Sequence, residues 1–244
     1  MKELQDDVKR QELIKTSNFS ECFSFDVASY TRLLRARAGE YIVREGEAPA
    51  CLYFLASGRA KLYRTLPNGR IALIDFFTAG YFIGEMELVS GANDTESIHA
   101  VQAIEDCLFL ALPLHAKTSA GLPLKTQLLS DPVFLRTLCR ILSQKNYRNI
   151  LSATKNQAFP LSVRLADFIL MTEHAGIYCE KHTQAAEYLG VSYRHLLYVL
   201  NQLTEEGALQ KVGHALRILD RAKLKKLAGE LHPEGCSPQQ RKEA

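Results

Sequence analysis

The spacing of glycines between residues 39 and 91 restricts the fold of this chain most strongly. Glycines separate short apolar runs there at intervals of 7 to 12 residues: Gly39, Gly46, Gly58, Gly69 and Gly80. Such punctuation is typical of many short antiparallel strands joined by tight turns. The sequence Pro67-Asn68-Gly69 predicts a hairpin turn, and a further strand pair is expected over residues 97–112. Together these strands predict a small barrel or roll over residues 31–130.

A long helix is expected after the roll, over residues 131–156. Pro132 can occupy the first turn of a helix. The strip along one face of this helix is apolar at first and becomes polar beyond Ser143. A strip without an obvious partner in its own chain indicates pairing with the same helix of a second subunit, and buried asparagines in such a seam fix its register. The residues predicted for this dimer interface are Leu135, Leu138, Ile141, Leu142, Lys145 and Asn149. Packing of the strip against the roll is the alternative, and the first half could do both.

The stretch from Lys181 to Asn201 has the spacing of two short helices joined by a tight turn. Ala186 supplies the small residue that a steep helix crossing needs, and Gly190 accepts the positive φ of the turn. The apolar residues expected to face inward are Val191, Leu196 and Val199, which leaves Ser192, Tyr193, Arg194 and Tyr198 pointing outward. This is the pattern of a helix-turn-helix over residues 182–201, whose second helix enters the major groove of DNA. An ordinary pair of packed helices would usually expose Lys, Glu and Gln instead.

The rest of the C-terminal half fits a winged helix-turn-helix domain over residues 157–230. A hinge at residues 158–160 precedes a helix that is expected to end near Gly176, and two strands around Val212–His214 form a candidate wing. A last helix runs to about Leu231, and the tail over residues 231–244 is predicted to be disordered. Residues 1–30 form a helical or loose lead-in. The predicted fold class is therefore α+β.

Bulk properties agree with one large or two modest domains, because 244 residues with 47% hydrophobic content can form real cores. The net charge of only +3 does not by itself indicate a nucleic-acid binder. No Asp or Glu occurs from Pro132 to Ala166, whereas six basic residues do: Arg136, Arg140, Lys145, Arg148, Lys155 and Arg164. A solvated helix face and a phosphate-contacting face both explain this run. The N-terminus lacks an apolar signal region and no apolar run approaches ~20 residues, so a cytoplasmic protein with no membrane partner is expected.

The cysteines give no recognisable metal motif. No two of the six lie closer than 29 residues, so the chain has no C-x-x-C zinc knuckle or ferredoxin-type run. Free thiols are expected in a reducing cytosol, with Cys107 and Cys139 in the core. Cluster ligation or redox chemistry stays open for five of them: Cys22, Cys51, Cys107, Cys139 and Cys179.

Enzyme classes that use such a roll are poorly supported. A metal-dependent cupin needs about three protein ligands, but His99 is the one histidine between Gly39 and Leu112. A G-x-S-x-G turn, which a hydrolase of that type would need, is also missing from the sequence.

The order of roll, long helix and winged helix-turn-helix resembles the CRP/FNR family of bacterial transcription regulators, within it the YeiL-type branch. The stretches "AGEYIVREGE", "FIGEMELVSG" and "HTQAAEYLGVSYRHLLYVL" carry the resemblance, which covers residues ~30–230. It implies a homodimer that binds double-stranded DNA at an inverted-repeat operator, with half-sites about one helical turn apart. RNA polymerase is a further partner that the family implies.

The resemblance also implies roles for individual residues of the helix-turn-helix. Base-reading positions fall at Tyr193, Arg194 and Tyr198. Phosphate-contacting positions fall at Ser192, His195, His182 and Thr183. Thr183 is in addition a candidate N-cap. These residues depart from the common reading sets of the family, so a different operator is expected, with Arg194 bidentate to guanine.

The effector pocket departs further from the family pattern. Gly84 and Glu85 match the Gly-Glu pair that grips the ribose of a cyclic nucleotide in the family. The arginine that would neutralise the phosphate falls at about Ser97, and no Arg occurs between Arg70 and Arg136. His99 could substitute only if protonated, and burying the phosphate without a counter-charge is costly. Cyclic AMP is therefore not expected.

The oxygen-sensing branch of the family uses a group of closely spaced N-terminal cysteines. Only Cys22 lies in that region of this chain, so a four-cysteine cluster is not expected either. The signal and the direction of regulation stay open.

Overall fold

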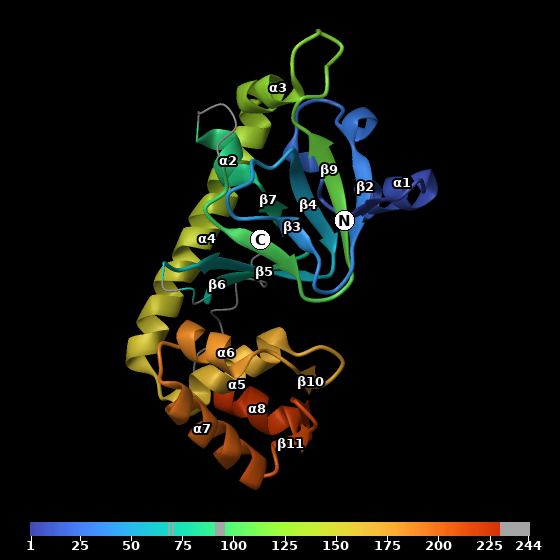
Figure 1. The fold of residues 1–244 in the computed structure, drawn as a ribbon. Helices are drawn as coiled ribbons and strands as arrows, with labels where there is room; N and C mark the ends of the chain where they lie inside the picture. The colour runs from blue at the N-terminus through green and yellow to red at the C-terminus, as the bar shows by residue number, and fades with distance from the viewer. Residues whose placement is uncertain (68, 70, 91–95, 230–244) are drawn as a thin grey trace. The chain divides into compact units, whose positions relative to one another are not determined.

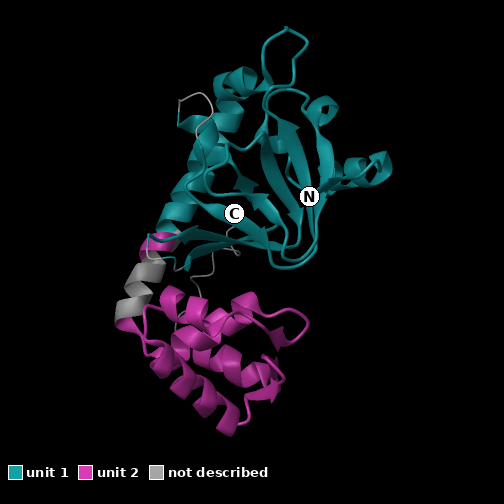
Figure 2. Cartoon of the chain, viewed as in Figure 1, with its two compact units in different colours: residues 1–147 teal, residues 148–244 magenta. Residues whose placement is uncertain are grey.

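The computed structural model describes residues 1–67, 69, 71–90 and 96–229, with backbone alone at residues 148 and 151–157. The chain divides into two compact units, residues 1–147 and 148–244 (Figure 2). The predicted tail over 231–244 lies outside the described residues. The elements are labelled in Figure 1.

The first unit is built on two antiparallel sheets, in the strand orders β1-β2-β9-β4-β7 and β3-β8-β5-β6. Their bounds are β1 Lys2–Glu3, β2 Arg32–Ala36, β3 Tyr41–Val43, β4 Cys51–Ser57, β5 Arg59–Thr65, β6 Ile71–Thr78, β7 Phe82–Ile83, β8 Ala100–Ala103 and β9 Cys107–Pro113. The predicted hairpin joins β5 to β6, and Gly69 at its turn has φ +76°. The roll predicted from the glycine spacing is thus present.

Gly58 shows why one of those glycines cannot be replaced. It turns the chain between β4 and β5 with φ +92°, a conformation that side chains with a Cβ rarely adopt. A Cβ atom there would also lie 2.7 Å from both the Asp106 carbonyl oxygen and the Cys107 sulfur. The tight turn from β4 to β5, which packs against the start of β9, therefore depends on glycine.

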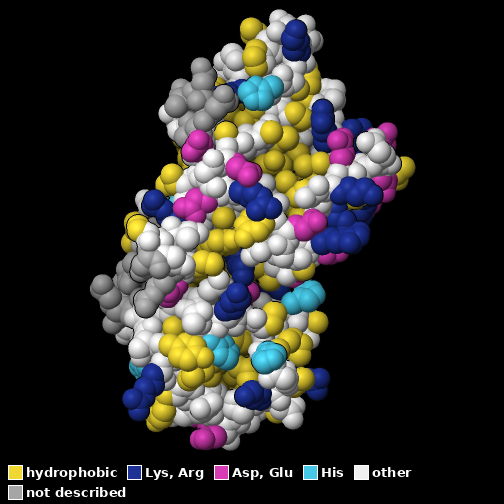
Figure 3. Space-filling model, in the orientation of Figure 1, with side chains coloured by type: hydrophobic (Ala, Val, Ile, Leu, Met, Phe, Trp, Pro, Cys, Tyr) yellow, Lys and Arg dark blue, Asp and Glu magenta, His cyan; other side chains and the backbone are white. Residues whose placement is uncertain are grey.

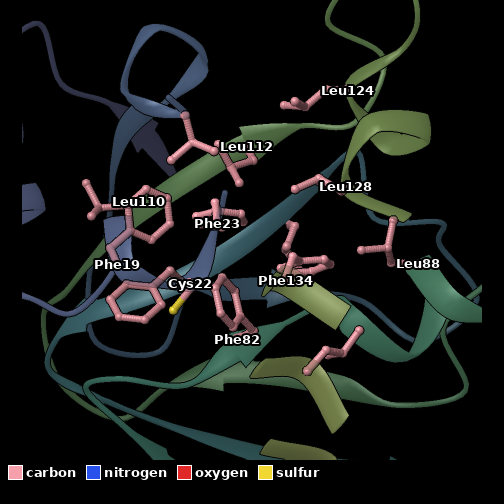
Figure 4. Close-up of a cluster of buried hydrophobic side chains, with 14 of the residues drawn as sticks. Phe19, Cys22, Phe23, Phe82, Leu88, Leu110, Leu112, Leu124, Leu128 and Phe134 are labelled. Atoms are coloured by element: carbon pink, nitrogen blue, oxygen red, sulfur yellow. The ribbon is translucent and has the colours of Figure 1, made fainter. Parts of the chain in front are cut away.

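Residues 1–30 do not form a separate lead-in but complete the core of the first unit. Helix α1 (Asp7–Thr16) and two 3-10 turns, Ser20–Cys22 and Ala28–Tyr30, precede β2. Phe19 and Phe23 are buried between the roll and the helices after it, and the Phe23 ring stacks 5.4 Å from that of Phe134 (Figure 4). No repeat or alternation in the sequence reveals this packing.

Helix α2 (Glu85–Val89) lies between β7 and β8, and two further helices, α3 (Leu124–Ser130) and α4 (Pro132–Ala158), follow the last strand of the roll. Buried Asp131 fixes the start of α4, because its carboxylate accepts hydrogen bonds from the backbone N–H groups of Val133 at 3.0 Å and Ser24 at 2.8 Å. The apolar face of α4 then packs on the roll.

This packing changes the predicted dimer interface. Leu138 and Ile141 are 2% and 7% exposed within their own chain, in one core cluster with Phe134. Leu135 and Leu142 are half-buried against the same cluster, and Asn149 is exposed. The prediction that Leu138 and Ile141 face a second subunit is therefore wrong, since the roll already covers them.

The second unit is a helical domain with a small three-stranded sheet. Its elements are α5 Leu161–Thr172, β10 Ile177–Tyr178, α6 His182–Tyr188, α7 Tyr193–Glu205, β11 Leu209–Val212, β12 Ala215–Ile218 and α8 Arg221–Ala228. The sheet has the order β10-β12-β11. Strands β11 and β12 form the predicted wing, whereas the sequence pattern contains no sign of β10. Helix α5 stops at Thr172, before the expected end near Gly176, because the chain turns back at residues 174–177, with His174 and Ile177 paired.

The helices of the described part do not include one long and apolar enough to cross a membrane.

Candidate nucleic-acid interface and effector pocket

Helices α6 and α7 form the expected helix-turn-helix. Ala186 is 3% exposed where the two helices meet, and its carbonyl oxygen accepts a 2.9 Å hydrogen bond from the Val191 N–H. Gly190 turns the chain with φ +64°, and a Cβ there would touch nothing within 4 Å. The backbone conformation alone, and not a lack of space, therefore favours glycine in this turn.

The two faces of α7 divide as the sequence predicts. Leu196, Val199, Leu200 and Leu203 are buried, which holds α7 in its own domain. Val191, predicted to face inward, is only half-buried. The exposed residues near the start of α7 are Ser192, Tyr193, Arg194, His195 and Tyr198. Tyr193 and Tyr198 are 49% and 64% exposed, so α7 holds two large aromatic side chains out to solvent.

Ser192 has a structural role beside its predicted phosphate contact. It is the N-cap of α7, and its hydroxyl oxygen accepts a hydrogen bond from the His195 backbone N–H at 3.2 Å. An N-cap of this kind satisfies a donor that the first turn of a helix leaves unpaired. The side chains that follow it are thus presented from a fixed helix start.

His182 and Thr183 lie at the start of α6. The N-cap of α6 is Lys181, so the prediction of Thr183 as the N-cap is wrong, although Thr183 is not buried. The half-buried His182 ring stacks on the Tyr178 ring with centroids 6.2 Å apart. Burial, together with the charge of Lys211, lowers the pKa of His182. The lowered pKa favours the neutral imidazole at neutral pH, and a neutral imidazole can still offer an N–H donor to a phosphate.

The wing adds a second exposed basic surface in the same unit. Lys211, Val212 and His214 are exposed at the turn between β11 and β12. Lys, Arg and His side chains are visible on the face of this unit drawn in Figure 3. The sequence located the wing but did not single out Lys211, whose positive charge helps to lower the pKa of His182.

The basic run over residues 132–166 is not a uniform phosphate-binding face. Arg164 is 9% exposed, and its guanidinium donates to the carbonyl oxygens of Phe159, at 2.9 Å, and of Leu189 at the end of α6. Lys145 is turned inward to Glu85. Arg136 and Arg140 are exposed. Two of the six basic residues therefore serve packing within the chain.

In the effector region, Gly84 and Glu85 begin α2. Gly84 is buried with φ +90°, and a Cβ there would lie 3.1 Å from the Cys51 carbonyl oxygen. Glu85 is 4% exposed, and its carboxylate lies 2.5 Å from the Lys145 ammonium group. The carboxylate that the family would turn to a ribose is thus paired with a cation of the same chain.

Ser97 and His99 do not supply the missing phosphate counter-charge. Ser97 is 4% exposed, and its hydroxyl donates to the His99 carbonyl oxygen at 3.0 Å. Burial lowers the pKa of the half-buried His99; Arg64 acts in the same direction, against the carboxylates of Glu87, Glu45 and Glu85. His99 could replace the arginine only with a protonated ring, and protonation of this ring is disfavoured at neutral pH.

The described cysteines differ in accessibility. Burial raises the pKa of both Cys22 and Cys107 to about 11 and also raises that of Cys51, which disfavours the reactive thiolates. Cys107 is fully buried as expected, but Cys139 and Cys179 are exposed, so the prediction of Cys139 in the core is wrong. Across the described residues, no three His, Cys, Asp or Glu side chains form a group that could hold a metal ion.

Family profiles match both halves of the chain. A "Cyclic nucleotide-binding domain" profile matches residues 33–118, and a "Crp-like helix-turn-helix domain" profile matches residues 163–227. The curated relative "Regulatory protein YeiL" of Escherichia coli O157:H7 is 53% identical over 219 residues, which cover 89% of this chain and 95% of the relative.

Solved structures show the same fold. TTHA1359, a CRP/FNR-family transcriptional regulator from Thermus thermophilus, has 22% identity and a TM-score of 0.62, covering 80% of this chain and 97% of its own. TTHB099, a CRP-family regulator from the same organism, has 20% identity and a TM-score of 0.61, covering 80% and 96%. With the identity to YeiL and the two domain profiles, these findings show that the chain belongs to the CRP/FNR family of transcriptional regulators.

Proposed function

We propose that this regulator binds an inverted-repeat DNA operator as a homodimer, with α7 of each subunit in a major groove. The observation that carries the proposal is the outward face of α7, where one arginine, one histidine and two tyrosines are exposed at the start of a capped helix. A helix-turn-helix places its second helix in this way, with N-terminal residues of that helix at the base edges.

Different side chains on this surface suit different contacts. The Arg194 guanidinium can donate two hydrogen bonds to O6 and N7 of a guanine, the commonest specific contact in the major groove. Tyr193 and Tyr198 offer ring edges for thymine methyl groups and hydroxyls for phosphates. The side chains of His182, Thr183 and His195 can donate hydrogen bonds to phosphate oxygens, and such contacts fix the register of a protein on DNA without reading sequence.

The second subunit is proposed to pack on a strip of α4 that the roll covers only in part. Leu135, Cys139, Leu142, Asn146 and Asn149 follow one another at spacings of four, three, four and three residues. This is the spacing of a coiled-coil seam. Cys139, Asn146 and Asn149 are exposed, and Leu135 and Leu142 are half-buried, so each keeps surface for a partner.

Cross-linking at Cys139 tests this dimer. In a parallel two-fold pair the two Cys139 side chains lie opposite each other, so a short bismaleimide should join two subunits of a variant that lacks the thiols of Cys179 and Cys236. Replacing Cys139 by Ser in that variant should abolish the product. A cross-link yield equal to that of randomly colliding monomers would contradict the proposed pairing.

The proposed regulator does not use cyclic AMP as its effector. The support is the pairing of Glu85 with Lys145 and the lowered pKa of His99, which leave a phosphate without a counter-charge at these positions. Its further proposed partner is RNA polymerase, and a DNA-bound regulator acts in the cytoplasm. We assign no enzymatic activity to the chain, since its family consists of regulators that act by binding.

A mobility-shift assay tests DNA binding directly. Sequences selected from a random pool by the protein should contain an inverted repeat, should survive excess competitor DNA, and should lose affinity steeply as salt rises, because bound phosphates release counterions. If the protein bound no selected sequence more tightly than the competitor DNA, the proposal would be contradicted. It would favour a protein partner for the two exposed tyrosines of α7 instead.

A further inference from the structure

Lys145 of α4 lies in a site on the roll that is suited to an ammonium group. Its nitrogen is 2.5 Å from a Glu85 carboxylate oxygen, and the two side chains are only 12% and 5% exposed. The same nitrogen donates to the Phe82 carbonyl oxygen at 3.1 Å and lies 4.4 Å from the centre of the Phe77 ring and 5.9 Å from that of Tyr81. A carboxylate, a carbonyl and two aromatic rings together stabilise a cation that has left water.

This ion pair joins the effector region to the helix with the dimer strip. Glu85 opens α2 directly after Gly84, in the position that matches the ribose-gripping residue of the cyclic-nucleotide binders. Lys145 lies in α4, one turn after buried Ile141. The next described side chains of α4, at residues 146, 147, 149 and 150, are exposed. The pair therefore stands where α4 leaves the roll.

The place of the contact suggests more than general stabilisation. In a regulator that depends on an effector, a bound ligand must interact differently with two arrangements of the protein in order to shift between them. Here a side chain of α4 itself provides a charged group to the effector-site carboxylate. Because the chain carries this group covalently, its effective concentration at the site is high and does not vary with metabolism.

We propose that Lys145 is a built-in effector: its ammonium group occupies the site at Glu85, Phe77 and Tyr81 and holds α4 against the roll without a small ligand. The consequence for DNA binding rests on the function proposed above. The opposite charges of Lys145 and Glu85 cancel each other. The site therefore has no unpaired positive charge that could bind an anionic ligand.

Variants at the two residues test the proposal in the full-length protein. Lys145→Met or Glu85→Met leaves one buried charge without its partner, and either should lower Tm by about 5–15 °C. Amide hydrogen exchange in residues 138–147 should become at least about tenfold faster, as the last turns of the docked part of α4 open more often. Affinity for the selected operator should fall by about tenfold or more in both variants. The double variant Lys145→Met/Glu85→Met should recover most of the Tm, the slow exchange and the affinity, because methionines of similar length pack there without a charge.

An ion pair elsewhere on the roll supplies the control. Arg59 and Glu105 are joined at 3.0 Å, and each side chain is 20% exposed. Arg59→Met should lower Tm without changing exchange in α4 or affinity for the operator. If Lys145→Met behaved like Arg59→Met, the pair would only stabilise the fold and the proposal would be overturned.

Titration of the wild-type protein with cyclic AMP gives an independent check. No heat of binding is expected at micromolar concentrations in isothermal titration calorimetry, and saturable binding that slowed exchange in α4 further would overturn a self-occupied site. Failure of the wild-type protein to bind any DNA would refute the proposed function alone, because the exchange measurement on α4 needs no DNA.

Discussion

Individual polar side chains of the unit that contains the helix-turn-helix fall into two groups. The Ser192 hydroxyl is engaged in the helix cap, and Arg164 is buried with its guanidinium on backbone carbonyls of its own domain. Arg194 and Tyr198, in contrast, are exposed on the outer face of α7. Residues of the second group are therefore the ones whose replacement should change recognition while leaving the domain folded.

Arg194→Ala should relax specificity at one base pair of each half-site. Loss of a bidentate contact to guanine costs about 1–3 kcal/mol at that position and little elsewhere. Binding measured against operators with each base substituted in turn would show this, with Arg136→Ala, an exposed arginine of the other unit, as the control. An equal loss of affinity for every sequence would instead identify Arg194 as a phosphate contact.

His182 should make the stability of the DNA-binding domain depend on pH. Burial, with Lys211, lowers its pKa in the folded chain below the ordinary 6.5. A histidine with a depressed folded pKa contributes stability that is present above the unfolded pKa and is lost as pH falls through the folded pKa, because the unfolded chain binds the proton more readily. Acidification should thus destabilise the domain.

Thermal unfolding between about pH 7.5 and 5 checks this. His182→Phe, which keeps a ring against Tyr178, should lose less Tm on acidification than the wild type, while exposed His214→Phe should follow the wild type. If the Tm of the wild type changed with pH as little as that of His182→Phe, the pH dependence could not be assigned to His182.

At the scale of elements, α4 serves two surfaces at once. Its buried face, with Phe134, Leu138 and Ile141, closes the core of the roll, while the strip with Cys139 and Asn146 faces solvent. Substitutions one turn apart on this helix should therefore have different consequences.

Leu138→Ala should lower the free energy of unfolding of the roll by about 2–5 kcal/mol, since it removes a 2% exposed side chain from a packed core. Leu142→Lys should largely preserve the fold but weaken self-association, because Leu142 is only half-buried within its own chain. Denaturant unfolding and sedimentation measure the two effects separately. Dissociation by Leu138→Ala without any loss of stability would contradict the burial described here.

At the scale of the whole molecule, the proposed dimer would carry two DNA-binding units, and the spacing of the operator half-sites then tests it. Inverted half-sites with centres about one helical turn apart present the same face of the duplex to both α7 helices. Adding half a turn, about five base pairs, moves one half-site to the opposite face. Affinity should then fall by at least about tenfold, towards that of a single half-site. Mobility shifts on a series of spacers would show this, and equal affinity at all spacings would contradict a two-fold dimer.

Local signals in the amino-acid sequence were enough to predict the strands of the roll and the helix-turn-helix. A glycine such as Gly69 or Gly190 takes a positive φ wherever its turn is formed, and the periodicity of α7 separates Leu196 from Tyr198 without reference to any other element. The exposed residues on which the proposed function rests could therefore be named before the structure.

The partners of the long side chains and of the N-terminal segment, in contrast, became known from the folded chain. Phe19 reaches the core from a segment without periodicity, Lys145 pairs with Glu85 across 60 residues, and Arg164 finds carbonyls at the end of α6. The pattern along α4 likewise did not distinguish packing of Leu138 against the roll from packing against a second subunit. Both kinds of contact require the same apolar spacing in the sequence. Burial and pairing depend on distances between segments remote in sequence, and folding is what sets those distances.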